Sequence, residues 1–252
     1  MIPVMKQPDI TKAKKILAVQ PHYDDNDIGA GGTLHLLAQR GAELVYLTVT
    51  DDMAGVISHQ DSQALTKPEA TALLRENQAQ AATWIGVKKQ IRLGFPDAGD
   101  YDYFLVRNQI IQAIRKEQPD LIFSVDPWSP YEAHHDHVLA GKACAEAAIL
   151  YDLPAIGEYH SEEMNDYALN GVVLYNTAYP NLVFDITKSI RAKQSALEAY
   201  TAQFSKSGIE RLIQQTTFLA SYIAREKDFE YGEALKVLAP WMLHGVPLTK
   251  ML

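Results

Sequence analysis

The sequence predicts an α/β fold built around a mainly parallel sheet. In the first two thirds of the chain, short apolar runs alternate with longer stretches that have the apolar spacing of a helix, which is typical of βα units. A composition of 47% hydrophobic and 21% charged residues agrees with an ordinary globular protein. We expect one domain over residues 1–252, with a core at about 14–150 and a C-terminal elaboration at about 151–252.

The core elements follow one another in βα order. The expected strands cover residues 15–19, 44–50, 90–93 and 121–125. The expected helices cover about residues 28–40, 68–85, 104–116 and 134–150. Crossovers of this kind are right-handed, so the four strands should lie parallel in one sheet.

The pattern changes after residue 150. Strands are expected at 171–176 and 182–186, joined by the turn-rich residues 177–181. Two helices should follow at about 188–204 and 208–226, and then a mixed tail that contains Tyr231, Trp241 and His244.

Charge and cysteine content narrow the function classes. A formal net charge of -8 argues against non-specific binding to nucleic acid, which draws on a basic face. The one cysteine, Cys144, lies in an alanine-rich stretch and is expected to be a buried structural thiol. Since the N-terminus lacks a secretory pattern and no apolar run is long enough to span a membrane, we expect a cytoplasmic protein.

A cluster of acidic residues follows the first expected strand. Residues 20–27 contain His22, Asp24, Asp25 and Asp27, and this crowding of like charge is unfavourable unless a cation neutralises it. In a helical turn, His22 and Asp25 would face the same way while Asp24 points elsewhere. The alternative is an Asx-type turn in which Asp25 or Asp27 caps the next helix.

A second cluster follows the fourth expected strand, in residues 126–137. His134 and His137 are three residues apart and can approach one point, and Asp136 is available to orient an imidazole. A catalytic zinc needs three nitrogen or oxygen ligands and an open position, and His22, Asp25 and His137 meet that count. A solvated surface at a loop-helix junction is the alternative interpretation of these histidines.

Other common motifs are missing. Gly29, Gly31 and Gly32 lack the spacing of a dinucleotide fingerprint, and the acidic cluster before them would repel a pyrophosphate. Close packing of a helix on the sheet explains these glycines better. The sequence also contains no serine-hydrolase elbow, P-loop or His-Glu-x-x-His motif.

These residues resemble the LmbE-like, or PIG-L, family of zinc-dependent N-acetylglucosaminyl de-N-acetylases. The family motif His-Pro-Asp-Asp-Glu appears at residues 22–26, followed by glycines in step, and the motif His-Pro-Asp-His appears at 134–137. Weaker similarity covers residues 50–55, 75–76, 93–97 and 193–203. The resemblance implies a Rossmann-like three-layer α/β/α fold and a homo-oligomer.

The sequence departs from the family pattern at several positions. Proline is replaced in both motifs, by Tyr23 and His135, and Asn26 replaces a glutamate. Further along the chain, family residues are replaced by Asp52, Met53, Tyr200 and Ala202. Since the predicted metal ligands and base are kept, we interpret these changes as altered substrate preference, with a catalytically degenerate sugar-binding protein as an alternative.

The resemblance implies a hydrolase that removes an acetyl group from the nitrogen of a small N-acetylated sugar or sugar conjugate. His22, Asp25 and His137 would hold Zn²⁺, with Fe²⁺ or Co²⁺ as alternatives. Asp24 would act as the base, and His134, oriented by Asp136, would stabilise the oxyanion.

Substrate contacts are expected from three further residues. Arg75 and Asp97 match family positions that would bind sugar hydroxyls or a charged aglycone, although Arg75 could instead pair with Glu76 or Glu69. Tyr131 would aid the oxyanion or line the pocket. A metal-dependent esterase or another amidase would use the same zinc and base, and a structural protein would carry no metal.

Overall fold

The computed structural model describes residues 6–56, 65–156, 167–247 and 249–251. Within these residues seven strands form one sheet in the order β3-β2-β1-β4-β5-β7-β6. The strands are β1 (Lys15–Gln20), β2 (Glu43–Thr50), β3 (Val87–Phe95), β4 (Leu121–Val125), β5 (Gly171–Tyr175), β6 (Leu182–Asp185) and β7 (Gly232–Leu238). The first five pair in parallel, and β7 pairs antiparallel with both β5 and β6.

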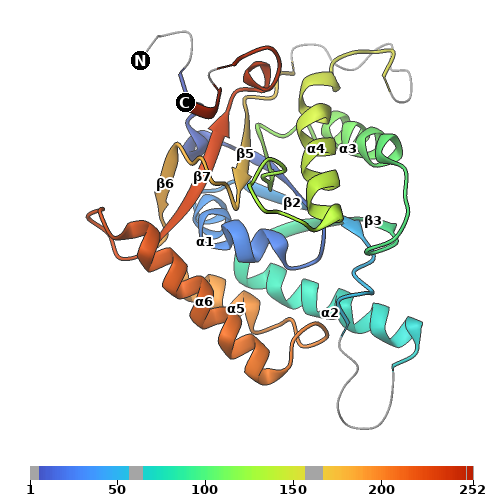
Figure 1. Cartoon of the computed structure of the whole chain (residues 1–252), viewed down its shortest axis with the longest axis vertical. Helices are drawn as coiled ribbons and strands as arrows, with labels where there is room; N and C mark the ends of the chain where they lie inside the picture. The colour runs from blue at the N-terminus through green and yellow to red at the C-terminus, as the bar shows by residue number, and fades with distance from the viewer. Residues whose placement is uncertain (1–5, 57–64, 157–166, 248, 252) are drawn as a thin grey trace.

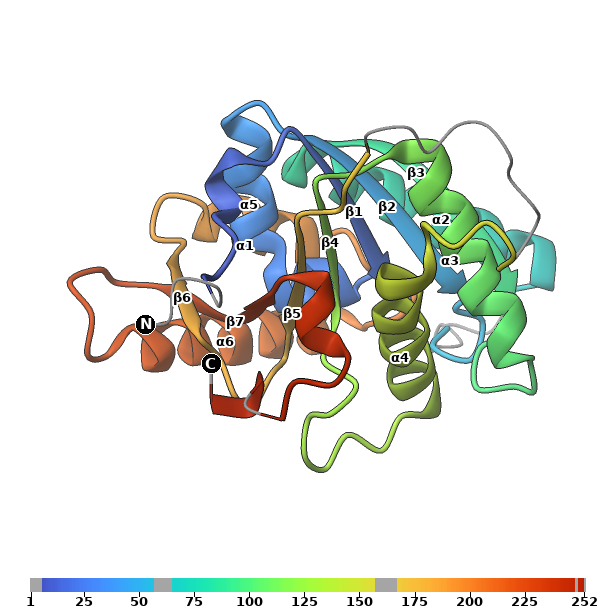
Figure 2. The ribbon, with the colours of Figure 1, turned by 90° about the horizontal axis from the view of Figure 1, so that it is seen from above.

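Helices cover both faces of this sheet (Figures 1 and 2). They are α1 (Asp25–Gln39), α2 (Lys67–Ile85), α3 (Tyr103–Glu117), α4 (His135–Leu150), α5 (Ile190–Leu197) and α6 (Lys206–Ala224). One core cluster joins the sheet to α1, α2 and α5, and the other joins it to α3 and α4. The predicted Rossmann-like three-layer α/β fold with a mainly parallel sheet is therefore confirmed.

Strand β1 illustrates why these residues form a central strand. Its side chains alternate between the two cores, with Ile16 and Ala18 on the α1 side and Leu17 and Val19 on the α4 side. All four are fully buried. A strand covered on both faces needs apolar residues at every position, which is why it reads as a continuous apolar run.

The glycines of α1 allow this helix to pack closely against the sheet. A Cβ atom on Gly29 would lie 2.1 Å from Cδ2 of Tyr175, and one on Gly32 would lie 2.8 Å from Cβ of Ile186. The prediction that these glycines serve helix packing is confirmed. The same contacts place the start of α1 against the carboxyl end of β5.

The C-terminal elaboration differs from the sequence prediction. The helix expected at 188–204 is the shorter α5, and the tail expected after residue 226 contains β7, which lies between β5 and β6. The sequence of β7 does not have the apolar pattern of a buried strand, because two of its buried residues, Glu233 and Lys236, are charged. A charged residue in a strand normally indicates a solvent-facing position, and here it does not.

The strand order places the two motif segments side by side. The chain leaves β1 toward β2 on one side and reaches β4 on the other, so the order reverses between β1 and β4. In open parallel sheets, ligands bind outside the carboxyl ends of the strands at this reversal.

Among the helices described, none has both the length and the apolar character needed to cross a membrane.

Candidate metal centre

The first motif folds into a tight bend between β1 and α1. Asp25 begins α1, and its Oδ2 accepts a hydrogen bond from the backbone N of His22 at 2.9 Å. The same oxygen lies 3.1 Å from Nδ1 of the His22 ring. Asp25 therefore closes the turn, as the Asx-type alternative expected, and also faces the imidazole.

The second motif meets the first at the start of α4. His134 is the N-cap residue of α4, and His137 lies in its first turn with Nε2 3.3 Å from Oδ1 of Asp25. The donor atoms of His22, Asp25 and His137 all lie within 4.8 Å of one another. The structure thus brings together the three residues expected to hold zinc, and their two nitrogens and one oxygen match the donor set of a catalytic zinc.

A second group shares His22 with the first. It consists of His22, Asp97, His134 and Asp136, whose donor atoms also lie within 4.8 Å of one another. Nε2 of His22 is 3.2 Å from Oδ1 of Asp97 and 3.4 Å from Oδ2 of Asp136. Asp97, expected to contact substrate, therefore lies directly at the histidines.

The carboxylates of the second group also hold loops in place. Oδ2 of Asp97 accepts hydrogen bonds from the backbone N of Ala54 at 2.8 Å and of Gly55 at 3.1 Å. Both oxygens of Asp136 are engaged, by the backbone N of Ala98 at 2.9 Å and the Tyr101 hydroxyl at 2.7 Å. Both oxygens of Asp136 are occupied in this way, whereas Oδ1 of Asp25 faces Nε2 of His137, so we favour His22, Asp25 and His137 as the metal ligands.

Asp24 is buried beside the ligands and makes no side-chain capping bond to α1. Burial, and then the charge of Asp25, raises the pKa of Asp24 to about 7. Burial, and then the charge of Asp24, raises the pKa of Asp52 to about 8. Such mutual repulsion between buried carboxylates is relieved by a bound cation, so this donor set fits a divalent metal.

Burial alone would lower the pKa of His22, but its carboxylate partners, Asp25 and then Asp97, raise it to about 11. In the metal-free protein this imidazole therefore carries a proton. A histidine must be neutral to bind a metal, so a metal bound by His22 would displace that proton.

The sequence analysis missed Glu132. Its Oε2 lies 3.2 Å from Nδ1 of His137, and its Oε1 accepts a hydrogen bond from the backbone N of His134 at 2.8 Å. A carboxylate on the far nitrogen of a ligating histidine fixes the orientation of the ring and raises its basicity. The position of Glu132 shortly before both histidines was the signal available in the sequence.

Four loops at this edge of the sheet contain a non-glycine residue in the left-handed backbone region. These residues follow β2, β3, β4 and β5 in turn and are Asp52 (φ 57°), Ala98 (φ 52°), Tyr131 (φ 69°) and Asn176 (φ 55°). Such conformations cost about 1–3 kcal/mol each and cluster at functional sites.

Two of the residues expected to contact substrate are exposed. Arg75 is exposed on α2. Burial raises the pKa of Tyr23, and the charge of Arg92, then the hydrogen bond and the charge of Arg75, oppose this rise. Glu69 is engaged by the backbone and hydroxyl of Thr66, and no ion pair of Arg75 with Glu69 or Glu76 occurs among the described residues. Tyr131 is fully exposed.

Asp136 also differs from its expected contact. Its oxygens accept hydrogen bonds from the backbone N of Ala98 and the Tyr101 hydroxyl, and Oδ2 also lies 3.4 Å from Nε2 of His22. The described contacts include no hydrogen bond from the His134 ring to Asp136. Asp136 therefore fixes the loop after β3 against the start of α4.

Known proteins share this sequence pattern and fold. The signature of the PIG-L, or GlcNAc-PI de-N-acetylase, family matches residues 17–148. The chain belongs to this family. Diacetylchitobiose deacetylase of Thermococcus kodakarensis is 31% identical over 241 residues, which is 95% of this chain and 88% of that protein.

Structural similarity extends over nearly the whole chain. N,N'-diacetylchitobiose deacetylase from Pyrococcus horikoshii, solved with its inhibitor MPG, has a TM-score of 0.85 and 30% identity over 96% of this chain and 90% of that one. A 1D-myo-inositol 2-acetamido-2-deoxy-alpha-D-glucopyranoside deacetylase from Rhodococcus erythropolis is 28% identical over 170 residues, 58% of each protein. The predictions of a PIG-L family member and of a deacetylase class of enzyme are confirmed.

Proposed function

We propose that this protein is a zinc-dependent hydrolase that removes the acetyl group from the nitrogen of an N-acetylglucosamine-type sugar or sugar conjugate. The observation that carries the proposal is the convergence of His22, Asp25 and His137 on one point beside the buried Asp24. The named sugar deacetylases among the relatives support the substrate class.

Zinc held by His22, Asp25 and His137 would supply polarisation of the acetamide carbonyl and acidification of the attacking water. Asp24 is left free to take the proton of that water and to return it to the departing amine. Its pKa, raised to about 7 by burial and then by Asp25, suits a group that exchanges protons near neutral pH.

His134 lies beside both of these histidines, with its ring centroid 4.8 Å from that of His22 and 5.0 Å from that of His137. When protonated, it would donate a hydrogen bond to the oxyanion that forms on the carbonyl. Asp97 and Arg75 would bind the sugar. The exposed side chain of Tyr131 would contact the bound substrate. The expectation of a homo-oligomer stays a prediction.

The proposal is tested by acetate release from zinc-loaded protein supplied with N-acetylglucosamine, its disaccharide, several conjugates and an acetyl ester. We expect release from at least one N-acetylated sugar, loss of release with a chelator, and recovery with zinc. Asp24→Asn should keep its zinc but lose turnover by about 10²–10⁴-fold.

The exposed Asp228 on the segment after α6 provides a matched control, and Asp228→Asn should keep full turnover. Full turnover by zinc-loaded Asp24→Asn would remove Asp24 from the role of base. Turnover of the ester alone would identify a different acyl substrate, and no release from any compound would contradict the proposed reaction.

A further inference from the structure

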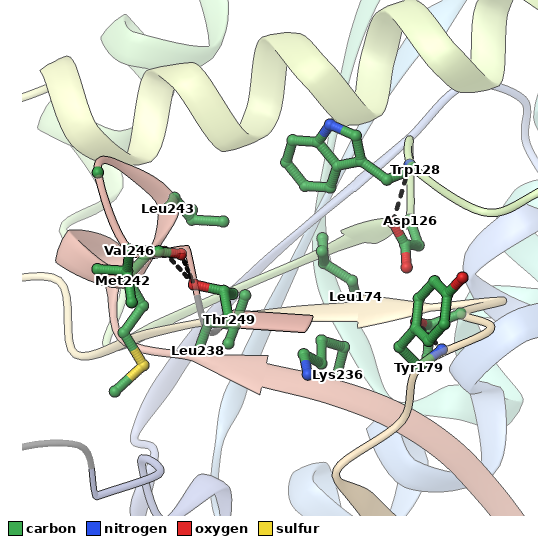
Figure 3. Close-up of a pocket in the computed structure, with 12 residues that line it drawn as sticks. Asp126, Trp128, Leu174, Tyr179, Lys236, Leu238, Met242, Leu243, Val246 and Thr249 are labelled. Atoms are coloured by element: carbon green, nitrogen blue, oxygen red, sulfur yellow. Dashed lines mark hydrogen bonds between the residues drawn. The ribbon is translucent and has the colours of Figure 1, made fainter. Parts of the chain in front are cut away.

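A cavity with a volume of about 400 Å³ lies at the carboxyl edge of the sheet, on the α4 side. Figure 3 shows Trp128, Asp126 and Tyr179 along one side of it and Met242, Leu243 and Val246 along the other. None of its lining residues belongs to either histidine and carboxylate group, so it is separate from the candidate metal centre.

Lys236 is the unusual residue of this cavity. It lies on β7 with 4% of its surface exposed, and it lines the cavity. Among the contacts of the described residues, its ammonium has neither a hydrogen-bond partner nor an ion pair within 4.0 Å. The Nζ atom itself is not fully buried, so the ammonium opens onto the cavity, where a ligand can accept a hydrogen bond from it.

Asp126 supplies the complementary group. It is also buried, at 4% exposure, and its Oδ1 accepts a hydrogen bond from the backbone N of Trp128 at 2.9 Å. Burial lowers the pKa of Lys236, and the nearby charge of Asp126 opposes this. The cavity therefore offers a cationic donor and an anionic acceptor whose charges cancel.

The remaining wall is apolar, with two aromatic side chains at its rim. Leu174, Leu238, Met242, Leu243 and Val246 form the wall, and the half-exposed Trp128 and Tyr179 stand at the opening. A concave, mostly apolar site with a few converging polar groups is the usual form of a small-molecule site.

We propose that this cavity binds an uncharged pyranose sugar, with adjacent hydroxyls bonded to Lys236 and Asp126 and an apolar ring face against Trp128. A hydroxyl both donates and accepts, so a pair of hydroxyls satisfies the ammonium and the carboxylate together. A singly charged ligand would pair with one of these groups and be repelled by the other. The proposal concerns binding and does not depend on the deacetylation reaction.

The test titrates the full chain with methyl glucopyranoside, which has no acetamide, and follows tryptophan fluorescence and ligand-detected NMR. We expect saturable binding with a fluorescence change that persists in Trp84→Phe and disappears in Trp128→Phe. Lys236→Met should bind at least about tenfold more weakly, as expected for loss of a hydrogen bond to a charged group, while exposed Lys206→Met should bind normally.

Asp126→Asn is the second variant, because its amide oxygen can still accept the hydrogen bond from Trp128 N. If Lys236→Met fails to fold, this variant decides the outcome, again with an expected loss of about tenfold or more. Absence of saturable binding, unchanged affinity in the folded variants, or binding of isobutyrate in place of the sugar would each overturn the proposal.

Discussion

Individual carboxylates determine how the candidate centre is organised. Asp25 faces both histidines that we propose as ligands, Glu132 contacts the other ring nitrogen of His137, and Asp136 joins the loop after β3 to α4. The contacts of Asp25 with His137 and of Asp136 with Ala98 join segments far apart in the chain. The contacts of Asp25 with His22 and of Glu132 with His137 join the first turn of a helix to the residues just before it. The centre is therefore assembled from three loops, and no single motif forms it.

Glu132 is expected to matter through His137. Changing Glu132→Gln removes the negative charge at Nδ1, so the zinc affinity should fall by about 10–100-fold while the fold is retained. Competition with a chromophoric chelator measures this directly. The exposed Glu226 gives the control, and equal zinc affinity of Glu132→Gln and Glu226→Gln would contradict the positioning role.

Cys144 should be chemically silent in the folded protein. It is fully buried in α4, and burial raises the pKa of its thiol to about 12, so thiolate is scarce below that pH. We expect no reaction with Ellman's reagent at pH 8 in the native state and one thiol per chain after unfolding in urea. Rapid native labelling would show that α4 opens locally or that Cys144 is not buried.

At the scale of the element, α1 combines two tasks. Its first residue, Asp25, is a proposed ligand, while its glycines let the helix lie close to β5 and to Ile186. Close packing thus sets the height of the proposed ligand above the sheet.

Two glycines of α1 give a matched comparison. In Gly29→Ala the new Cβ would lie 2.1 Å from the buried Tyr175 ring, so we expect a loss of stability of about 1–3 kcal/mol or more. In Gly31→Ala the nearest atom is 3.4 Å away, and the higher helix propensity of alanine should make it neutral or more stable by up to about 1 kcal/mol. Urea unfolding measures the stability of both variants. Equal stability of Gly29→Ala and Gly31→Ala would show that α1 is loosely packed.

At the scale of the whole molecule, a buried ion pair connects the C-terminal elements to the core. Nζ of Lys193 in α5 lies 2.6 Å from Oε1 of Glu233 in β7, and both side chains are buried. Glu233 also accepts hydrogen bonds from the backbone N of Gly32 at 3.0 Å and of Thr33 at 2.8 Å in α1. One carboxylate of β7 thus bonds to two other elements, α5 and α1.

Lys193→Met should therefore destabilise the protein strongly, by about 3–5 kcal/mol, because Glu233 would be left as a buried charge without its partner. Adding Glu233→Gln should recover part of this loss, since the amide oxygen can still accept one backbone hydrogen bond. Thermal unfolding compares these variants with exposed Lys206→Met. Wild-type stability of the Lys193→Met single variant would show that the pair contributes little.

The core strands and helices could be predicted from the sequence because their signals are local. β4 lies at the predicted residues, and α2 and α4 each begin one residue away from the predicted start. Two pairs of candidate site residues could also be predicted, because their spacing of three residues is a local feature. These pairs are His22 with Asp25 and His134 with His137. The division into core and elaboration stays a prediction.

The tertiary structure alone decided which residues meet. The sequence did not indicate that β7 would insert between β5 and β6 or that Asp97 would reach His22. These outcomes depend on strand order and on loop paths, which bring together residues far apart in the chain. Periodicity and motif spacing record short-range geometry, so they specified the elements and the proposed ligands, while long-range packing assembled the centre and the cavity beside Lys236.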